Sequence, residues 1–171
     1  PVFVWAIGDV RIVQRIWMEH GHNTTYITYT YARGTSNVRL ALKPLCACRD
    51  HRALTKGGYH IDVEPSAAPW PNGQAVTVLA HTERMGGSMP PFRILTNGGS
   101  ITPESEWWWS FHLAEEKRRG EENQEDLFAA ASIMADLKLG NTLAVVLTAE
   151  ASDPQPWHDA LHAEQQRQQE L

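Results

Sequence analysis

Short apolar segments closed by turn-forming residues follow one another along this chain, and this succession most constrains its fold. Residues 10–18 and 24–31 are rich in β-branched and aromatic side chains, and the sequence HGHN between them is typical of a turn. They therefore predict a β-hairpin. Residues 38–43 then alternate between apolar and polar or small side chains, which is the period of a half-buried strand.

Turn-forming residues divide the rest of the chain in the same way. Gly-Gly, Pro-Asn-Gly, Pro-Pro and Leu-Gly-Asn sequences separate further segments that have the composition of strands. Many short strands at near-regular spacing predict a mainly all-β fold, with antiparallel strands in a sandwich or barrel. The further predicted strands are residues 59–64, 74–81, 92–96, 106–111, 131–138 and 142–149.

The segment 153–171 is the exception to this strand pattern. Asp153 can cap a helix, Pro154 suits a first helical turn, and Trp157 and later apolar residues follow at helical spacing. The last residues, QQRQQEL, offer little apolar surface, so this helix needs to pack on something outside the chain. We expect residues 1–152 to form one β domain and residues 153–171 to begin a linker helix.

Length and charge limit the classes of function. The 171 residues suit one domain with a substantial core, and no apolar run approaches the roughly 18 residues of a membrane span. The formal net charge is -5, and the basic residues are scattered, whereas nucleic-acid domains usually carry a basic stripe. We therefore expect a soluble protein with neither nucleic acid nor membrane as a partner.

The two cysteines and the first residues bear on the cellular setting. Cys46 and Cys48 are separated by one residue in a predicted strand, and we do not expect them to form a disulfide. A reducing cytoplasm suits them best. The opening PVFVW has neither an initiator Met nor a basic leader, so we expect the chain to begin inside a longer protein.

A polar segment, residues 45–58, leaves a predicted strand and ends in a double glycine. Polar side chains on a loop held at a strand end are where binding groups tend to lie. The charged and imidazole groups of this loop can exchange hydrogen bonds with sugar hydroxyls, although a solvated turn with a local ion pair fits them equally well. The polar residues are Arg49, Asp50, His51, Arg52, Thr55 and Lys56.

A run of aromatic residues is the second unusual feature. In a regular strand, Trp107, Trp109 and Phe111 share one face and Trp108 takes the other. One of these faces must join the core, and an indole left outside can stack on the apolar face of a pyranose ring. The alternative, which large aromatic residues favour in general, is that the run only fills the core or covers a domain interface.

The histidines and carboxylates do not by themselves assign a catalytic or metal site. His158 and His162 stand four residues apart on the predicted helix, but the HExxH pattern is absent, so a surface helix is favoured over a metal site. Glycosidic cleavage requires two carboxylates about 5–10 Å apart, which a sequence cannot measure. The residues alone therefore indicate a β-rich domain with one candidate binding loop and no catalytic group.

Seven motifs occur in a fixed order between about Phe3 and Glu150. They are RIWMEHG (15–21), NTTY (23–26), LxLKPL (40–45), RDHR from Arg49 with Thr55 and Gly57, DVEP (62–65), FHLAEExRRG (111–120) and EDLF (125–128). No single motif is diagnostic, whereas their order and spacing are specific. Together they resemble the N-terminal domain of bacterial and archaeal-type glycogen debranching enzymes, the amylo-α-1,6-glucosidase type.

The resemblance implies an antiparallel β-supersandwich, galactose-mutarotase-like, with a C-terminal linker helix. An (α/α)6 barrel that holds the acid and base carboxylates would follow it, outside this chain. The parent enzyme is then a cytoplasmic glycoside hydrolase that cleaves α-1,6-linked glucose from glycogen or limit dextrin, without a cofactor or metal. The present chain is expected to be inactive alone, with the α-glucan and its own barrel as partners. The resemblance and the residue patterns above together give the candidates for substrate binding or for the domain interface, which are Arg49, Asp50, His51, Thr55, Trp107 and Trp108.

Two other functions remain open at this point. A stand-alone aldose-epimerase-like enzyme can use the same sandwich fold, but it needs a histidine acid and a glutamate base in one cleft, and the histidines here do not occupy the expected positions. A pure scaffold domain without sugar contact is the other alternative. A mutarotation assay discriminates the epimerase, and titration with a glucan discriminates the scaffold.

Overall fold

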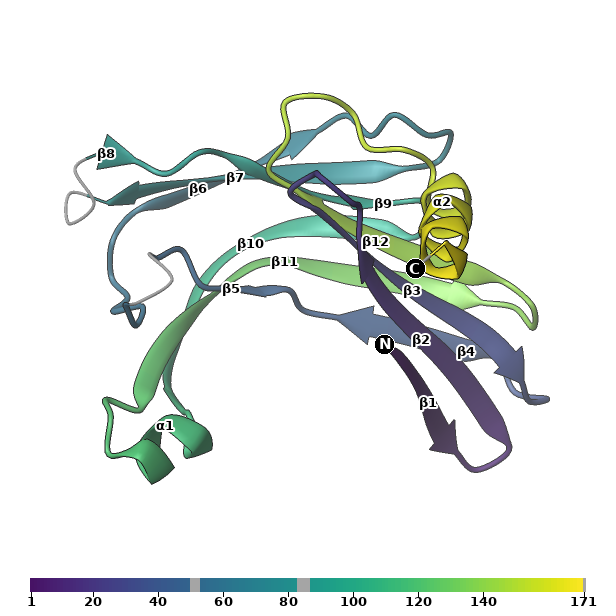
Figure 1. The fold of residues 1–171 in the computed structure, drawn as a ribbon, viewed down its shortest axis with the longest axis horizontal. Helices are drawn as coiled ribbons and strands as arrows, with labels where there is room; N and C mark the ends of the chain where they lie inside the picture. The colour runs from purple at the N-terminus through teal and green to yellow at the C-terminus, as the bar shows by residue number, and fades with distance from the viewer. Residues whose placement is uncertain (50–52, 83–86, 171) are drawn as a thin grey trace.

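The computed structural model is a sandwich of two antiparallel sheets and describes residues 1–49, 53–82 and 87–170 (Figure 1). The large sheet has eight strands in the order β1-β2-β3-β12-β9-β7-β6, with β8 paired to β7. The last strand of the chain, β12, therefore lies in the middle of this sheet. The strands are β1 (Val2–Ile7), β2 (Val10–Met18), β3 (Thr24–Arg33), β6 (Ile61–Ser66), β7 (Gln74–Thr82), β8 (Gly87–Ser88), β9 (Phe92–Thr96) and β12 (Thr142–Thr148).

The small sheet has four strands and carries the longest hairpin of the molecule. Its order is β10-β11-β4, and β5 pairs with β11 beyond the end of β4. The far end of the β10–β11 hairpin projects beyond the large sheet and carries the short helix α1 (Figure 1). These elements are β4 (Val38–Leu42), β5 (Leu45–Cys46), β10 (Ser100–His112), α1 (Ala114–Arg119) and β11 (Gln124–Leu137).

The main core lies between the two sheets and follows from the alternation of side chains along each strand. Tyr31 on β3 and Val76 and Ile94 on the opposite half of the large sheet turn inward and are buried. They join Phe128 and Ile133 of β11 in the same cluster. Burial of apolar side chains at about 25 cal/mol per Å² makes this inter-sheet layer the main stabilising feature of the fold.

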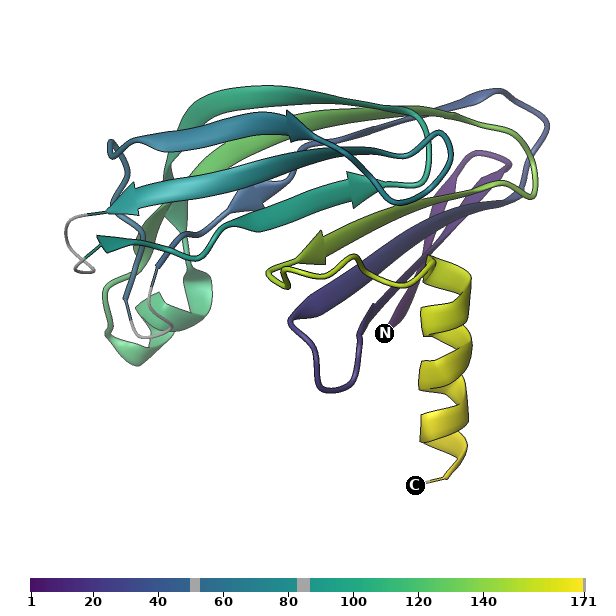
Figure 2. The same cartoon turned by 90° about the horizontal axis from the view of Figure 1, so that it is seen from above.

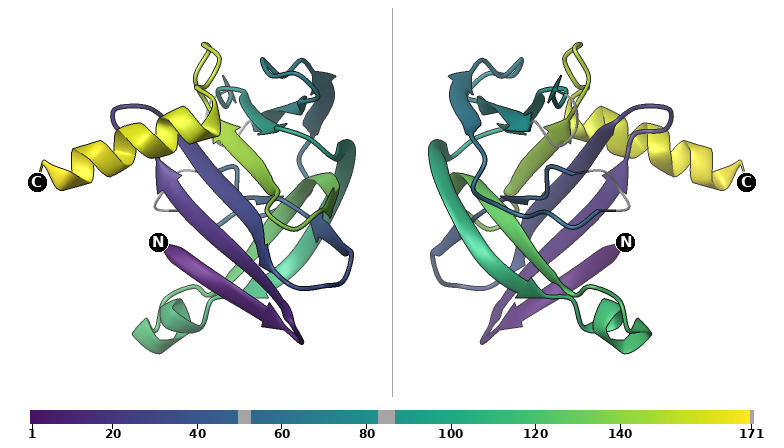
Figure 3. Two further views of the ribbon diagram at one scale, coloured as in Figure 1. Left: turned by 90° about the vertical axis from the view of Figure 1, so that its right-hand side faces the viewer. Right: turned by 90° about the vertical axis from the view of Figure 1, so that its left-hand side faces the viewer.

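The helix α2 (Trp157–Gln169) packs on the outer face of the large sheet. Trp17 and Tyr26 stack there with ring centroids 5.1 Å apart, and Ala160 is buried in the same cluster. Only the first turns of α2 contribute to this cluster, and the rest of the helix projects from the sandwich with the C-terminus at its free end (Figures 2 and 3).

The structure confirms the predicted fold class and most predicted strands, including the β2–β3 hairpin. The predicted start of the helix is wrong, because α2 begins at Trp157 and not at Asp153. A residue that precedes a proline is disfavoured in the α conformation, and both Asp153 and Gln155 precede prolines. Instead of capping the helix, Asp153 accepts a hydrogen bond of 2.7 Å from Arg93.

Two further features concern the thiols and the helices. Cys46 and Cys48 are free cysteines, and burial raises their pKa values to about 12 and about 11. Among the described residues, neither helix is long and apolar enough to cross a membrane.

Candidate functional site

A buried carboxylate fastens the polar loop between β5 and β6 to the start of β11. Glu125 is only 5% exposed. Its Oε1 accepts a hydrogen bond from Nε of Arg49 and a second bond, 3.1 Å long, from the backbone N–H of Thr55. One oxygen atom of Glu125 therefore joins Arg49 and Thr55, two described residues of the loop, to the start of β11.

The next residue of β11, Asp126, also holds the loop between β5 and β6 by hydrogen bonds. Its Oδ2 accepts from the N–H of Gly57 and its Oδ1 from the N–H of Ser110, both at 2.9 Å. The backbone N–H of Asp126 donates in turn to the carbonyl of Thr55 at 3.0 Å. The hydrogen bonds from Gly57 and Ser110 lower the pKa of Asp126 below its ordinary value of 3.8. Asp126 thereby joins the loop to the bend in β10.

Trp107 lies under this loop and belongs to the core. Its ring makes edge contacts with Tyr59 and Phe128, at centroid distances of 5.0 and 5.3 Å. A Cβ atom added to Gly57 would lie 2.6 Å from Cε3 of Trp107 and 2.9 Å from Cζ3 of Trp109. The absence of a side chain at Gly57 therefore lets the loop approach both indoles.

A bulge in β10 changes the predicted distribution of the aromatic side chains. The pairing of β10 with β11 shifts between Trp108 and Phe111, and Ser110 adopts a positive φ of 60°. Phe111 is therefore not on the face of Trp107 and Trp109, as regular alternation predicts. It stacks on Trp108 instead, at 6.3 Å and 12° between the ring planes.

The two outer indoles differ in how freely they face solvent. Trp108 is 40% exposed, its Nε1 donates to Glu106 at 3.0 Å, and Nζ of Lys43 lies 5.3 Å from its ring centroid. Trp109 is 60% exposed and contacts Trp107, with the ring planes tilted by 33°. Trp109 thus presents the larger unoccupied aromatic surface.

Charged groups border these indoles and are paired with each other. Nζ of Lys56 donates to the carbonyl of Gln124 at 2.9 Å and lies 2.6 Å from a carboxylate oxygen of Glu122. Nζ of Lys43 lies 2.8 Å from Glu104. An aromatic surface with paired charges at its border suits a neutral ligand that carries hydroxyl groups better than an ionic one.

The structure brings together three of the residues predicted from the sequence. Glu125 joins Arg49 to Thr55, and Trp107 of β10 lies under Gly57 of the same loop. Trp108 lies on the other face of β10. Asp50 and His51 lie outside the described residues. Trp109, Glu125 and Asp126 were not predicted as site residues, although EDLF is one of the motifs that carry the resemblance, and it contains both carboxylates.

The histidines of α2 do not form a site with other potential metal ligands. His158 and His162 are both exposed, and Nε2 of His158 lies 3.4 Å from Asp159. Among the described residues, no group of three or more His, Cys, Asp or Glu side chains is arranged to hold a metal ion.

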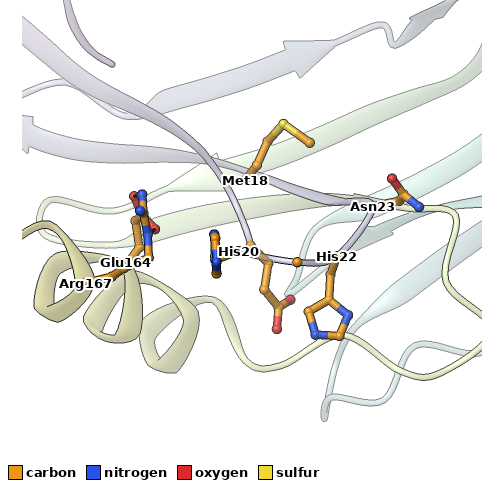
Figure 4. Close-up of a pocket in the computed structure, with 8 residues that line it drawn as sticks. Met18, His20, His22, Asn23, Glu164 and Arg167 are labelled. Atoms are coloured by element: carbon orange, nitrogen blue, oxygen red, sulfur yellow. Dashed lines mark hydrogen bonds and ion pairs between the residues drawn. The ribbon is translucent and has the colours of Figure 1, made fainter. Parts of the chain in front are cut away.

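A hollow of about 420 Å³ lies between the β2–β3 turn and α2 (Figure 4). His20 faces Glu164 and Arg167 there, and His22 belongs to the turn itself, where its N–H donates to the carbonyl of Glu19. Two hydrogen bonds of 2.8 Å join Arg167 to Glu164 and lower the pKa of Glu164 to about 2. This hollow borders the docked helix, and its lining among the described residues includes no Trp, Tyr or Phe side chain.

Comparison with known proteins adds one finding to this geometry. A family model described as "Glycogen debranching enzyme N terminal" matches residues 1–144. Searches of curated proteins and of solved structures gave no significant match.

Proposed function

Since the chain belongs to the family of glycogen debranching enzyme N-terminal domains, we propose that it recognises α-glucan for a glycoside hydrolase. In this proposal the chain is not catalytic. It supports the (α/α)6 barrel of the parent enzyme and binds glycogen or limit dextrin near the scissile α-1,6 bond. The acid that protonates the leaving oxygen and the base that activates water belong to the barrel.

The observation that carries this proposal is the exposed indole of Trp109, which lies beside the loop that Glu125 and Asp126 hold. Trp109 is 60% exposed and contacts Trp107, which is itself fixed by Tyr59 and Phe128. Stacking of a sugar ring on a preorganised indole costs less conformational entropy than binding that must first order a mobile side chain. Arg49 and Glu125 then act as positioning residues for the loop, and Trp109 as the group that contacts the glucan.

The remaining assignments follow from the same proposal. Residues 1–152 form the sandwich domain, and residues 153–171 begin the linker to the barrel. The projecting part of α2 supports this role, because its first turns are docked on the sandwich and the rest has no described partner in the sandwich core. Glycogen breakdown places the parent enzyme in the cytoplasm.

The test is glucan binding by the 171-residue chain and by single variants. We expect Trp109→Ala to weaken binding of glycogen, measured by affinity electrophoresis, by about tenfold, which corresponds to the roughly 1.4 kcal/mol of a good aromatic contact. Leu139→Ala is the matched control, because Leu139 is 59% exposed and lies away from the loop. Equal retention of both variants would exclude Trp109 as the contact, and a wild-type chain that glycogen does not retain would favour the scaffold function. Mutarotase activity in the wild-type chain would favour the epimerase.

A further inference from the structure

The inner face of β1 and β2 extends beyond the small sheet. The register pairs Trp5 with Ile12 and Ile12 with Tyr31, and the last two belong to the inter-sheet core, so Trp5 lies on the inner face. Phe3 lies on the same face, because it stands opposite Gln14 and two residues from Trp5. Trp5 is 55% and Phe3 47% exposed, and Figure 1 shows β1 at the free edge of the large sheet.

Polar side chains form a row across this apolar face. Nε1 of Trp5 donates to Oε1 of Gln14 at 3.1 Å, and Nε2 of Gln14 donates to the hydroxyl of Tyr29 at 3.1 Å. This row crosses three neighbouring strands, a span of about 10 Å. The Tyr29 hydroxyl accepts in this row, so its own proton is available to a ligand, as are the second N–H and the second acceptor site of Gln14.

The row leads into a cavity of about 510 Å³ between the sheets. Its lining includes Ile27 and Tyr29 from β3 of the large sheet. From the small sheet it includes Leu42 of β4, Cys46 of β5 and Lys43 between these two strands. Lys43 is paired with Glu104, so the cavity contains no uncompensated charge among its lining residues. The surface is continuous from Trp5 to the cavity, because Tyr29 belongs to both the row and the lining.

The chemistry of this surface specifies its ligand. The inner-face side chains of β1 and β2 are aromatic, aliphatic or amide groups without charge, which disfavours a nucleic acid, a phosphorylated ligand or a charged peptide. A purely apolar partner would bury the Tyr29 O–H and the remaining hydrogen-bonding sites of the Gln14 amide without partners. A neutral oligosaccharide has apolar ring faces for the indole and hydroxyl groups for the row. The side chains concerned are Phe3, Trp5, Ile7, Gln14, Ile16 and Met18.

We propose that the surface formed by Trp5, Gln14 and Tyr29 is a second binding site, for a neutral oligosaccharide. It is separate from the first candidate site, because Trp109 belongs to β10 of the small sheet. The choice of an α-glucan as its ligand rests on the proposed function, whereas the location of the site rests on the geometry of β1 to β3.

The test is calorimetric titration of the 171-residue chain with maltoheptaose. We expect Trp5→Ala to remove one class of sites or to weaken it at least tenfold. Gln14→Leu should have a similar effect, because it removes the hydrogen-bonding amide and keeps an apolar side chain of similar size. Val4→Ala is the matched control, since Val4 is on the same strand, is 62% exposed and points to the opposite face. Circular dichroism checks that each variant is folded.

Three results would overturn this site. The first is unchanged maltoheptaose binding in Trp5→Ala, and the second is an equal loss in Val4→Ala. The third is self-association in light scattering that Trp5→Ala abolishes and maltoheptaose does not affect, which would assign the face to a second copy. Weakening by Trp109→Ala alone would overturn this inference and leave the proposed function standing, and weakening by Trp5→Ala alone would support this inference and exclude Trp109 as a glucan contact. No maltoheptaose binding by the wild-type chain would overturn the proposed function.

Discussion

At the scale of single residues, the candidate site depends on two neighbouring carboxylates with different partners. Glu125 is buried and joins Arg49 to the backbone of Thr55, whereas Asp126 accepts two backbone N–H groups. Arg49, Thr55 and Gly57 lie some 70 residues away along the chain, so local sequence patterns do not reveal these partners. A polar side chain next to a strand start looks like any solvated turn until the fold brings its partner to it.

We expect Glu125→Ala to lower the free energy of unfolding by about 2 kcal/mol, because it leaves the buried N–H of Thr55 and the side chain of Arg49 without this acceptor. Urea denaturation measures this. Glu122→Ala serves as the control, since the Glu122 side chain is 67% exposed and its loss should cost no more than about 0.5 kcal/mol. Equal stability of the two variants would contradict the fastening role of Glu125.

Gly57 provides a steric test of the contact between the loop and the indoles. We expect Gly57→Ala to destabilise the chain by about 1–3 kcal/mol, since its Cβ would lie 2.6 Å from Trp107 and force the loop or the ring to move. Gly98→Ala is the control, because nothing lies within 4 Å of a Cβ at that position. Thermal unfolding should separate the two variants, and similar midpoints would argue against the close approach.

The lowered pKa of Asp126 predicts a pH dependence. A carboxylate whose pKa is lower in the folded than in the unfolded state stabilises the fold above the unfolded pKa, and this stabilisation is lost as the pH falls through the folded value. The wild-type chain should therefore exceed Asp126→Asn in stability at neutral pH, and the difference should shrink below pH 3.8. Urea denaturation of both chains at several pH values measures it. A difference that stays constant with pH would contradict the assignment.

At the scale of elements, the strands were easier to predict than the helices. The strands β2, β3, β4 and β9 have the composition or alternation of strands between turn-forming residues, and their observed bounds agree with the predictions within two residues. The strand β1 was not predicted, because its continuous apolar sequence has no alternation, and α1 was not predicted, because AEEKRR has no apolar face. The bulge at Ser110 was also invisible, since its backbone is held by the distant Asp126.

The docking of α2 can be tested at one buried alanine. We expect Ala160→Asp to undock the first turns of the helix, because an unpaired carboxylate in the Trp17–Tyr26 cluster costs at least about 2 kcal/mol. Ala163→Asp is the control on an exposed position of the same helix. Hydrogen exchange of the α2 amides should increase in Ala160→Asp and remain as in the wild type in Ala163→Asp. Unchanged exchange in both would mean that the helix does not depend on this contact.

At the scale of the whole molecule, the order of the strands determines when the fold can be completed. The large sheet consists of a half with β1 to β3 and a half with β6, β7 and β9, and β12 alone joins them. The bond between Thr24 and Thr148 spans 124 positions of the chain, and such distant contacts slow folding because the intervening segment must first be ordered. During synthesis on a ribosome, the two halves of the large sheet therefore remain unpaired with each other, with their apolar faces exposed, until residues 142–148 leave the exit tunnel. The nascent chain is consequently most exposed to chaperones and proteases in the interval just before that segment emerges.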